Sequence, residues 1–183
     1  MRQQRKISRH PAGFTLIEAM ISIVILSFGV LSLAAVYAQG IMFSSISQYN
    51  YIAEKKAEEA VETIFTARDT KVLTWAQIQN VSTGGVFIDG AAPLLDPGPD
   101  GLVGTADDNA LLPDTIIIGP GSDGMLGTTD DKTINLNSIM NRTIAITPVA
   151  GEANLRQITV TINYRFGRIQ SSYTLISYIS AFA

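Results

Sequence analysis

The chain has 183 residues, a length that suits one modest domain with an appendage and does not suit several domains. Hydrophobic residues make up 46% and charged residues 16%, which excludes an intrinsically disordered chain. There is no cysteine and one histidine, His10, so disulfides, thiolate metal sites and cysteine nucleophiles are excluded and histidine-based catalysis is disfavoured. The composition therefore does not predict an enzyme.

Charge is distributed unevenly along the chain. The formal net charge is −3, yet Arg2, Arg5, Lys6 and Arg9 place four positive charges in the first 13 residues. The remainder holds nine Lys or Arg against 16 Asp or Glu, a net charge of −7. Such an acidic body repels nucleic acid and is not attracted to anionic lipid headgroups, so no nucleic acid is predicted and the natural partner is a cation.

An apolar segment follows the basic leader. Residues 19–53 carry no charge, and residues 19–38 are long and apolar enough to cross a hydrocarbon core of ~30 Å. The positive-inside rule keeps the leader cytoplasmic and sends the C-terminal body outside. A secretory signal peptide ending at Val36-Tyr37-Ala38 is one interpretation. Glu18 favours another, because a carboxylate in lipid is costly unless it has a partner or a function.

The residues around this acid resemble a known processing site. Gly13-Phe14-Thr15-Leu16-Ile17-Glu18, after a short basic leader, is similar to the site of type IV prepilins and type II secretion pseudopilins. The resemblance implies cleavage after Gly13 by a prepilin peptidase, N-methylation of the new terminal Phe14, and an assembly role for Glu18. Its implied partners are the peptidase/methyltransferase, other pilin or pseudopilin subunits, the inner-membrane assembly platform and the lipid bilayer.

Electrostatics gives a physical reason for the implied assembly role of Glu18. Glu18 is unfavourable alone in a bilayer, and the terminal ammonium of a neighbouring subunit can neutralise it in the low-dielectric surroundings. The resemblance implies a single-pass protein of the bacterial inner membrane, with a cytoplasmic N-terminus and a periplasmic C-terminal domain, which then enters a pilus or pseudopilus. Within the family, the chain looks most like PilV-type minor pilins.

One long helix is predicted after the leader. No proline occurs from Ala12 to Ala92, and apolar residues recur at spacings of three and four, as on one face of a helix. These residues are Met42, Ile46, Tyr49, Ala53, Ala57, Ala60, Val61 and Ile64. We expect a membrane or assembly half at residues 14–38 and an amphipathic half at residues 39–70.

A Gly-, Pro- and Asp-rich loop is predicted at residues 84–131. It contains an internal repeat: residues 97–108 (copy 1) match residues 120–131 (copy 2) at eight of twelve positions. No Lys or Arg occurs between Lys71 and Lys132, whereas nine aspartates lie in that interval.

The spacing of the repeat suggests a calcium site. Counting from Asp96, copy 1 has Asp100 at position 5, Gly101 at 6 and Asp107 at 12, which resembles EF-hand-like or thrombospondin-type calcium loops. The candidate ligands are Asp96, Asp100, Asp107, Asp108, Asp123, Asp130 and Asp131. Position 3 is glycine in both copies and position 1 of copy 2 is Gly119, so the alternative is two solvated turns that bind nothing. No cofactor is required, and Ca²⁺ is a candidate structural ion.

The C-terminal third predicts antiparallel strands. Ile158, Val160, Ile162, Tyr164 and Phe166 alternate with polar residues, as in a half-buried strand. Gly167-Arg168 predicts a two-residue turn, and a return strand over 169–180 would place Tyr173 opposite Ile162 and Leu175 opposite Val160. Further strands are predicted at residues 142–149, 115–118 and, most weakly, 86–88.

These expectations combine into an α+β, pilin-like fold, in which a long N-terminal helix packs on a small antiparallel sheet. The expected divisions are a cleaved leader at 1–13, the helix halves at 14–38 and 39–70, and an extracytoplasmic β domain at 71–183. The expected function is a structural subunit of a type IV pilus or type II secretion pseudopilus, as a minor pilin or a pseudopilin, with no enzymatic activity. The alternative is a membrane-anchored, non-assembling domain that binds calcium or acts in adhesion.

Overall fold

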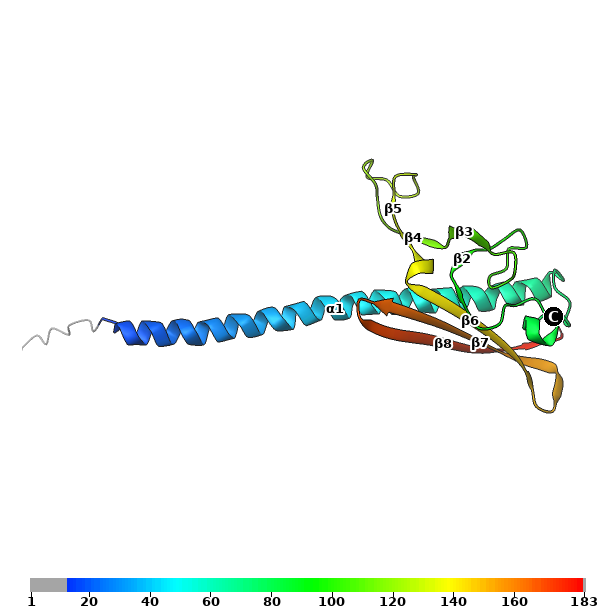
Figure 1. The fold of residues 1–183 in the computed structure, drawn as a ribbon, viewed down its shortest axis with the longest axis horizontal. Coiled ribbons are helices and arrows are strands. Elements are labelled where there is room, and N and C mark those ends of the chain that lie inside the picture. Colours follow the sequence, from blue (N-terminus) through cyan, green and yellow to red (C-terminus); the bar gives the residue numbers. More distant parts are fainter. Residues whose placement is uncertain (1–12, 183) are drawn as a thin grey trace, which may run out of the picture. The chain divides into compact units, whose positions relative to one another are not determined.

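The computed structural model describes residues 13–182, so residues 1–12 of the leader predicted at 1–13 lie outside the described residues. The chain divides into two compact units, Met1–Ser45 and Ile46–Ala183. Figure 1 labels the elements along the chain. They are α1 (Leu16–Asp69), η1 (Val81–Thr83), β1 (Ala91–Pro93), β2 (Leu95–Asp96), β3 (Asn109–Pro113), β4 (Thr115–Gly119), β5 (Lys132–Asn135), η2 (Leu136–Ser138), β6 (Met140–Val149), β7 (Glu152–Phe166) and β8 (Ile169–Ser180).

Helix α1 confirms the long helix expected from the proline-free segment. Its first part belongs to the N-terminal unit, where every residue from Gly13 to Ser44 is exposed. Serines in this part donate their hydroxyl protons to carbonyl oxygens four residues earlier: Ser22 to Glu18, Ser27 to Ile23 and Ser32 to Phe28, at 2.7–2.8 Å. These bonds satisfy the polar groups within the helix itself, so its outer surface is almost wholly apolar.

The second part of α1 forms one wall of the core of the C-terminal unit. Ala53, Ala57, Ala60 and Ile64 are fully buried, which confirms this portion of the predicted apolar stripe. Alanines at this spacing have small side chains, and a helix can therefore lie close to a sheet along them.

A four-stranded antiparallel sheet in the order β1-β6-β7-β8 forms the opposite wall. Strands β7 and β8 pair with Ile162 opposite Tyr173 and Val160 opposite Leu175, as predicted from the hairpin pattern. Gly167 in the connecting turn has φ +59°, a conformation that glycine adopts without strain. Alternate residues of β6 and β7 are buried: Met140, Arg142, Ile144, Ile146, Ile158, Val160, Ile162 and Tyr164.

Two small two-stranded sheets, β2-β3 and β4-β5, occupy the predicted loop region of residues 84–131, except that β5 begins just after it at Lys132. The expected strand at residues 115–118 is confirmed as β4, which pairs with β5. The weakest expectation, a strand at residues 86–88, is wrong. Phe87 forms only an isolated bridge with Asn80 and is buried in the core, so this short apolar run anchors a turn instead of extending the sheet.

Candidate functional site

The N-terminal motif lies at the start of α1. Gly13 and Phe14 precede the helix, and the Phe14 side chain is 83% exposed. The backbone N–H of Glu18 donates to Oγ1 of Thr15 at 3.3 Å, so Thr15 caps the helix. Sequence reasoning missed this cap, although Thr15-Leu16-Ile17-Glu18 has the T-x-x-E pattern that predicts one. The cap starts the helix at Leu16 and leaves the Gly13–Phe14 bond in exposed, non-helical chain.

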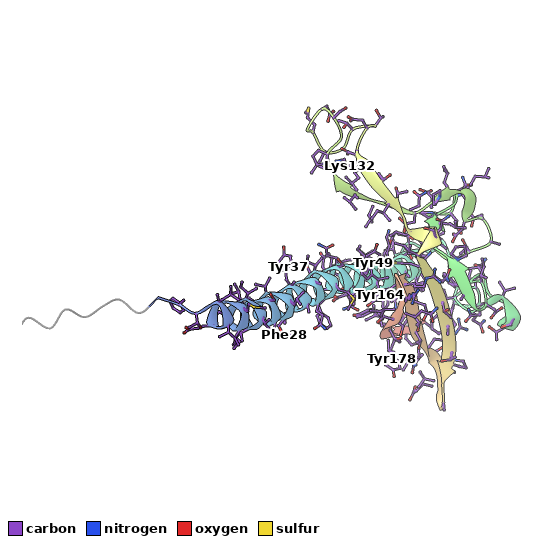
Figure 2. The ribbon with its side chains drawn as sticks, turned by 60° about the vertical axis from the view of Figure 1, so that its left-hand side comes forward. Phe28, Tyr37, Tyr49, Lys132, Tyr164 and Tyr178 are labelled. Carbon is purple, nitrogen blue, oxygen red and sulfur yellow. The ribbon has the colours of Figure 1, made fainter. Side chains whose placement is uncertain are left out.

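The apolar side chains of the first part of α1 are exposed in the described chain. Phe28 and Tyr37 point away from the helix axis into open space (Figure 2), and both are largely exposed. An 18-residue window of α1 has a mean hydropathy of 2.5, enough in length and composition to cross a membrane. An apolar surface of this size requires lipid or protein around it.

The two copies of the acidic repeat fold into the same loop. Asp100 Oδ1 accepts a hydrogen bond from the N–H of Leu102 at 2.8 Å, and Asp123 Oδ1 accepts one from Met125 at 2.8 Å. Further along, Thr105 donates to Asp107 Oδ1 at 2.7 Å, as Thr128 does to Asp130 at 2.8 Å. The equivalent partners and closely similar distances show that the repeated residues specify one local conformation.

The last aspartate of each copy closes the second turn of the loop. Asp108 Oδ2 accepts from the N–H of Gly104 at 2.8 Å, and Asp131 Oδ2 accepts from Gly127 at 2.6 Å. Both glycines have positive φ, +82° and +88°. Glycine is the residue that adopts this conformation most readily, which accounts for its repetition in both copies.

Close backbone approach explains a second pair of glycines. A Cβ at Gly98 would lie 2.3 Å from the carbonyl oxygen of Asp107, and one at Gly121 would lie 2.2 Å from that of Asp130. The position that an EF-hand fills with an acid is therefore filled here by a glycine that lets the two ends of the loop touch.

The surroundings of the two copies differ. Leu102 and Val103 of copy 1 are buried at 4% and 1% exposure and belong to the core, whereas the equivalent Met125 and Leu126 of copy 2 are 65% and 69% exposed. Copy 2 is carried on the β4-β5 hairpin, which projects away from the four-stranded sheet in Figure 1; Lys132, labelled in Figure 2, directly follows copy 2 at the loop end of β5. Copy 1 is thus part of the core, and copy 2 is a surface loop.

The aspartates of the two loops have different electrostatic surroundings. Hydrogen bonds from the side chains of Ser122 and Thr128 lower the pKa of Asp130 to about 2. In copy 1, the Thr105 hydroxyl lowers the pKa of Asp107. Burial raises the pKa of Asp108, although the N–H of Gly104 and the nearby Arg142 oppose the shift.

The structure brings together a charged cluster that the sequence analysis missed. Lys56 on α1 lies 2.7 Å from Asp114 Oδ2 and 2.8 Å from Glu59 Oε2. Burial alone would lower the pKa of Lys56, but these two carboxylates raise it. Arg142 is 3% exposed, and its Nη1 has no hydrogen-bond partner among the described residues. Its pKa is lowered by burial, against the attraction of Asp108, Glu59 and Asp114.

The signal for Arg142 was present in the sequence. It alternates with Met140, Ile144 and Ile146 on the inward face of β6. A charged residue in that pattern must find opposite charge nearby, because an unpaired buried cation is very unfavourable.

The predicted calcium ligands are only partly gathered. Asp96 lies in β2, with its backbone paired to Asn109, and the other six aspartates lie in the two loops. Within residues 13–182, no group of three or more Asp, Glu, His or Cys side chains is placed to hold a metal ion. Most of the loop carboxylate oxygens accept N–H or O–H protons, although Oδ1 of Asp131 is buried with no partner in the described chain. Calcium binding stays a prediction.

Comparison with known proteins identifies the N-terminal segment. Residues 8–34 match the prokaryotic N-terminal methylation motif, the prepilin-type signature. This match includes Gly13, Phe14 and Glu18, and it ends within the apolar part of α1. No curated protein and no solved structure matches the chain.

Proposed function

We propose that the chain is a structural subunit of a type IV pilus or a type II secretion pseudopilus, as a minor pilin or a pseudopilin. A prepilin peptidase cleaves it after Gly13, and Phe14 becomes the methylated N-terminus. The observation that carries the proposal is the methylation motif at residues 8–34, which runs into the exposed apolar part of α1. The role is structural and includes no catalytic step.

The geometry of the motif supports processing at this bond. Phe14 is exposed and the helix begins two residues later, so a protease at the membrane surface reaches non-helical chain. After cleavage, the new ammonium group at Phe14 is cationic with or without a methyl group. Glu18 lies one helical turn further into the apolar segment, and we propose that it pairs with the ammonium of an adjacent subunit during assembly.

The same proposal places the protein in the bacterial inner membrane before assembly, with its C-terminal unit in the periplasm. The apolar part of α1 would then leave the bilayer and pack between subunits, with the inner-membrane platform supplying the machinery. An apolar helix with internally satisfied serines fits both surroundings, because lipid and a filament core both exclude water.

Mass spectrometry of the mature protein tests the proposal. The full chain is produced with a prepilin peptidase, and the expected product begins at methylated Phe14. Gly13→Val should block cleavage because it places a branched side chain next to the scissile bond, whereas Gly29→Ala within the helix should be processed normally. An intact N-terminus, or a start at Gln39, would contradict the proposal and support a membrane-anchored domain that does not assemble.

A further inference from the structure

The C-terminal unit has an acidic cavity on the second part of α1. The cavity has a volume of about 280 Å³. It is lined by Glu59, Glu62, Thr63, Thr66, Ala67, Thr70, Val72, Asp100, Gly101 and Leu102. The lining thus comes from one face of the helix, the segment after it and copy 1 of the repeat.

The lining combines apolar side chains with the carboxylates of Glu59, Glu62 and Asp100. Ala67, Val72 and Leu102 provide the apolar surface. Glu62 makes no ion pair among the described residues, whereas Glu59 Oε2 forms an ion pair with Lys56 Nζ at 2.8 Å. Lys71 is exposed beside two lining residues but does not line the cavity itself. This chemistry fits an arginine side chain, whose methylene stem packs on apolar surface while its guanidinium binds carboxylates.

A basic, partly apolar surface lies elsewhere on the same unit, at the β7-β8 turn. Arg165 and Arg168 are exposed there, and neither forms an ion pair with a described residue. Phe166 and Ile169 lie between and beside them and add apolar contact area. We call residues 165–169 the basic tip. Its charge and its mixed polar and apolar character complement those of the acidic cavity.

Within one chain the basic tip is too far from the acidic cavity to enter it. The Phe166 ring packs against Tyr49, with 5.4 Å between ring centroids, so the tip lies beside the start of this part of α1. Glu62 is 13 residues further along the helix. At ~1.5 Å per residue, that separation is about 20 Å. The basic tip can therefore reach an acidic cavity only on another chain.

We propose that the basic tip of one copy of this chain docks into the acidic cavity of a second copy. Because the two surfaces are different, the contact is head-to-tail and leaves a free tip and a free cavity at the two ends. Repetition of the contact builds an open-ended series of subunits. The inference rests on the proposed function in that it supplies a contact between C-terminal units, in addition to the contact through the helix.

Cysteine cross-linking tests this contact, because the chain has no cysteine of its own. Thr66→Cys places a thiol in the cavity, and Ile169→Cys places one in the tip without removing a charge. The full chain carrying both changes, oxidised in membranes or filaments, should form a ladder of cross-linked dimers, trimers and larger products. The matched control pair is Thr66→Cys with Ala150→Cys, which puts the second thiol in the exposed β6-β7 turn and should give no ladder.

Charge reversal on the double-cysteine chain tests the electrostatic part. Arg165→Glu with Arg168→Glu should reduce cross-linking by roughly fivefold to tenfold, the scale of one or two ion pairs at a surface. Adding Glu62→Arg should restore cross-linking, which a merely misfolded chain would not do. High salt should weaken the wild-type contact by screening.

Several outcomes would overturn the inference. These are equal ladders from both cysteine pairs, no ladder in assembled filaments, no recovery with Glu62→Arg, or a product that joins the chain to a different protein. Filaments that contain the processed chain without this cross-link would disprove the tip–cavity contact and leave the proposed function standing. A chain that is never processed at Gly13 but still forms the ladder would disprove the proposed function and leave the tip–cavity contact standing.

Discussion

The Asp107 carboxylate lies 3.3 Å from the backbone nitrogen of Asp100 and accepts its hydrogen bond. The bond spans seven residues and joins the first turn of copy 1 to the second. Asp130 and Asp123 have the same relationship, also at 3.3 Å. One bond of this kind, made twice, explains how a segment with so many turn-forming residues takes a defined shape.

The pH response of copy 2 follows from Asp130. Its pKa in the folded chain is about 2, and an aspartate in an unfolded chain titrates near ~3.9. A lowered pKa means that the charged form stabilises the loop above that unfolded value, and that this contribution is lost as the pH falls towards 2. We expect the Asp130 carboxylate resonance in the full chain to titrate close to pH 2 by NMR.

Ser122→Ala provides the control for this titration, because the Ser122 hydroxyl donates to Asp130 Oδ2 at 2.7 Å. Its loss should raise the pKa of Asp130 and leave that of Asp107 in copy 1 unchanged. An Asp130 that titrates like an unfolded aspartate would show that the copy 2 loop does not form in solution.

The unequal burial of the two copies predicts unequal costs of truncation. Leu102→Ala should lower the free energy of unfolding by ~2–4 kcal/mol, because it opens a cavity in the core. Met125→Ala at the equivalent position of copy 2 should change it by less than ~0.5 kcal/mol, since that side chain is exposed. Urea unfolding of the full chain in detergent measures both. Similar losses would mean that copy 2 is also packed against the domain.

Close approach at Gly98 predicts a steric effect. Gly98→Ala should destabilise the folded chain by ~1–3 kcal/mol, because its Cβ would lie 2.3 Å from a backbone oxygen that cannot easily move. Gly119→Ala is the matched control: no atom lies within 4 Å of its Cβ position and its φ is not positive. Thermal unfolding of the two variants, compared with the native chain, decides the point. Equal midpoints for both would show that the loop accommodates the methyl group.

Calcium binding is tested by titration. If the repeats bind Ca²⁺, millimolar calcium should raise the thermal midpoint of the full chain, and the buried, unpartnered Oδ1 of Asp131 marks where copy 2 would respond. Asp123→Asn with Asp131→Asn should remove the copy 2 part of the effect, whereas Asp89→Asn, outside both copies, should not. An unchanged midpoint and unchanged spectra at millimolar calcium would mean that the loops are solvated turns.

Glu18→Ala tests the assembly contact. The variant keeps the exposed apolar helix but loses the carboxylate that would pair with a neighbouring N-terminus, so its amount in filaments should fall to about a tenth or less. Glu58→Ala removes an exposed acid further along α1 and should enter filaments normally. Immunoblots of sheared filaments measure both, with whole-cell levels for reference. Normal incorporation of Glu18→Ala would rule out the pairing.

Much of the fold was predictable because its signals are local. The β7-β8 register follows from alternation on both sides of Gly167-Arg168, and the buried part of α1 follows from the spacing of Ala53, Ala57 and Ala60. The strand expected at residues 86–88 failed for a tertiary reason. Phe87 is buried against the core, and three apolar residues do not distinguish an anchoring turn from a strand.

In the candidate sites, too, local features were predictable from the sequence and tertiary contacts were not. The repeat indicated two similar loops, and the structure has them, but the spacing of the aspartates did not reveal that their oxygens accept backbone N–H groups. Nor did it reveal which copy is buried, because that depends on contacts with Ile144 and α1 that are distant in sequence. The Lys56–Asp114 pair joins residues 58 positions apart, and no sequence pattern indicated it.

The exposed position of copy 2 also bears on how the chain evolves. The two copies have similar sequences, but only copy 1, with Leu102 and Val103, contributes side chains to the core. In copy 2, at the end of the β4-β5 hairpin, the equivalent side chains are exposed, and core packing does not constrain them. Mutations at Met125 and Leu126 are therefore neutral for the architecture, and any selection that preserves them acts through whatever the hairpin meets outside its own domain.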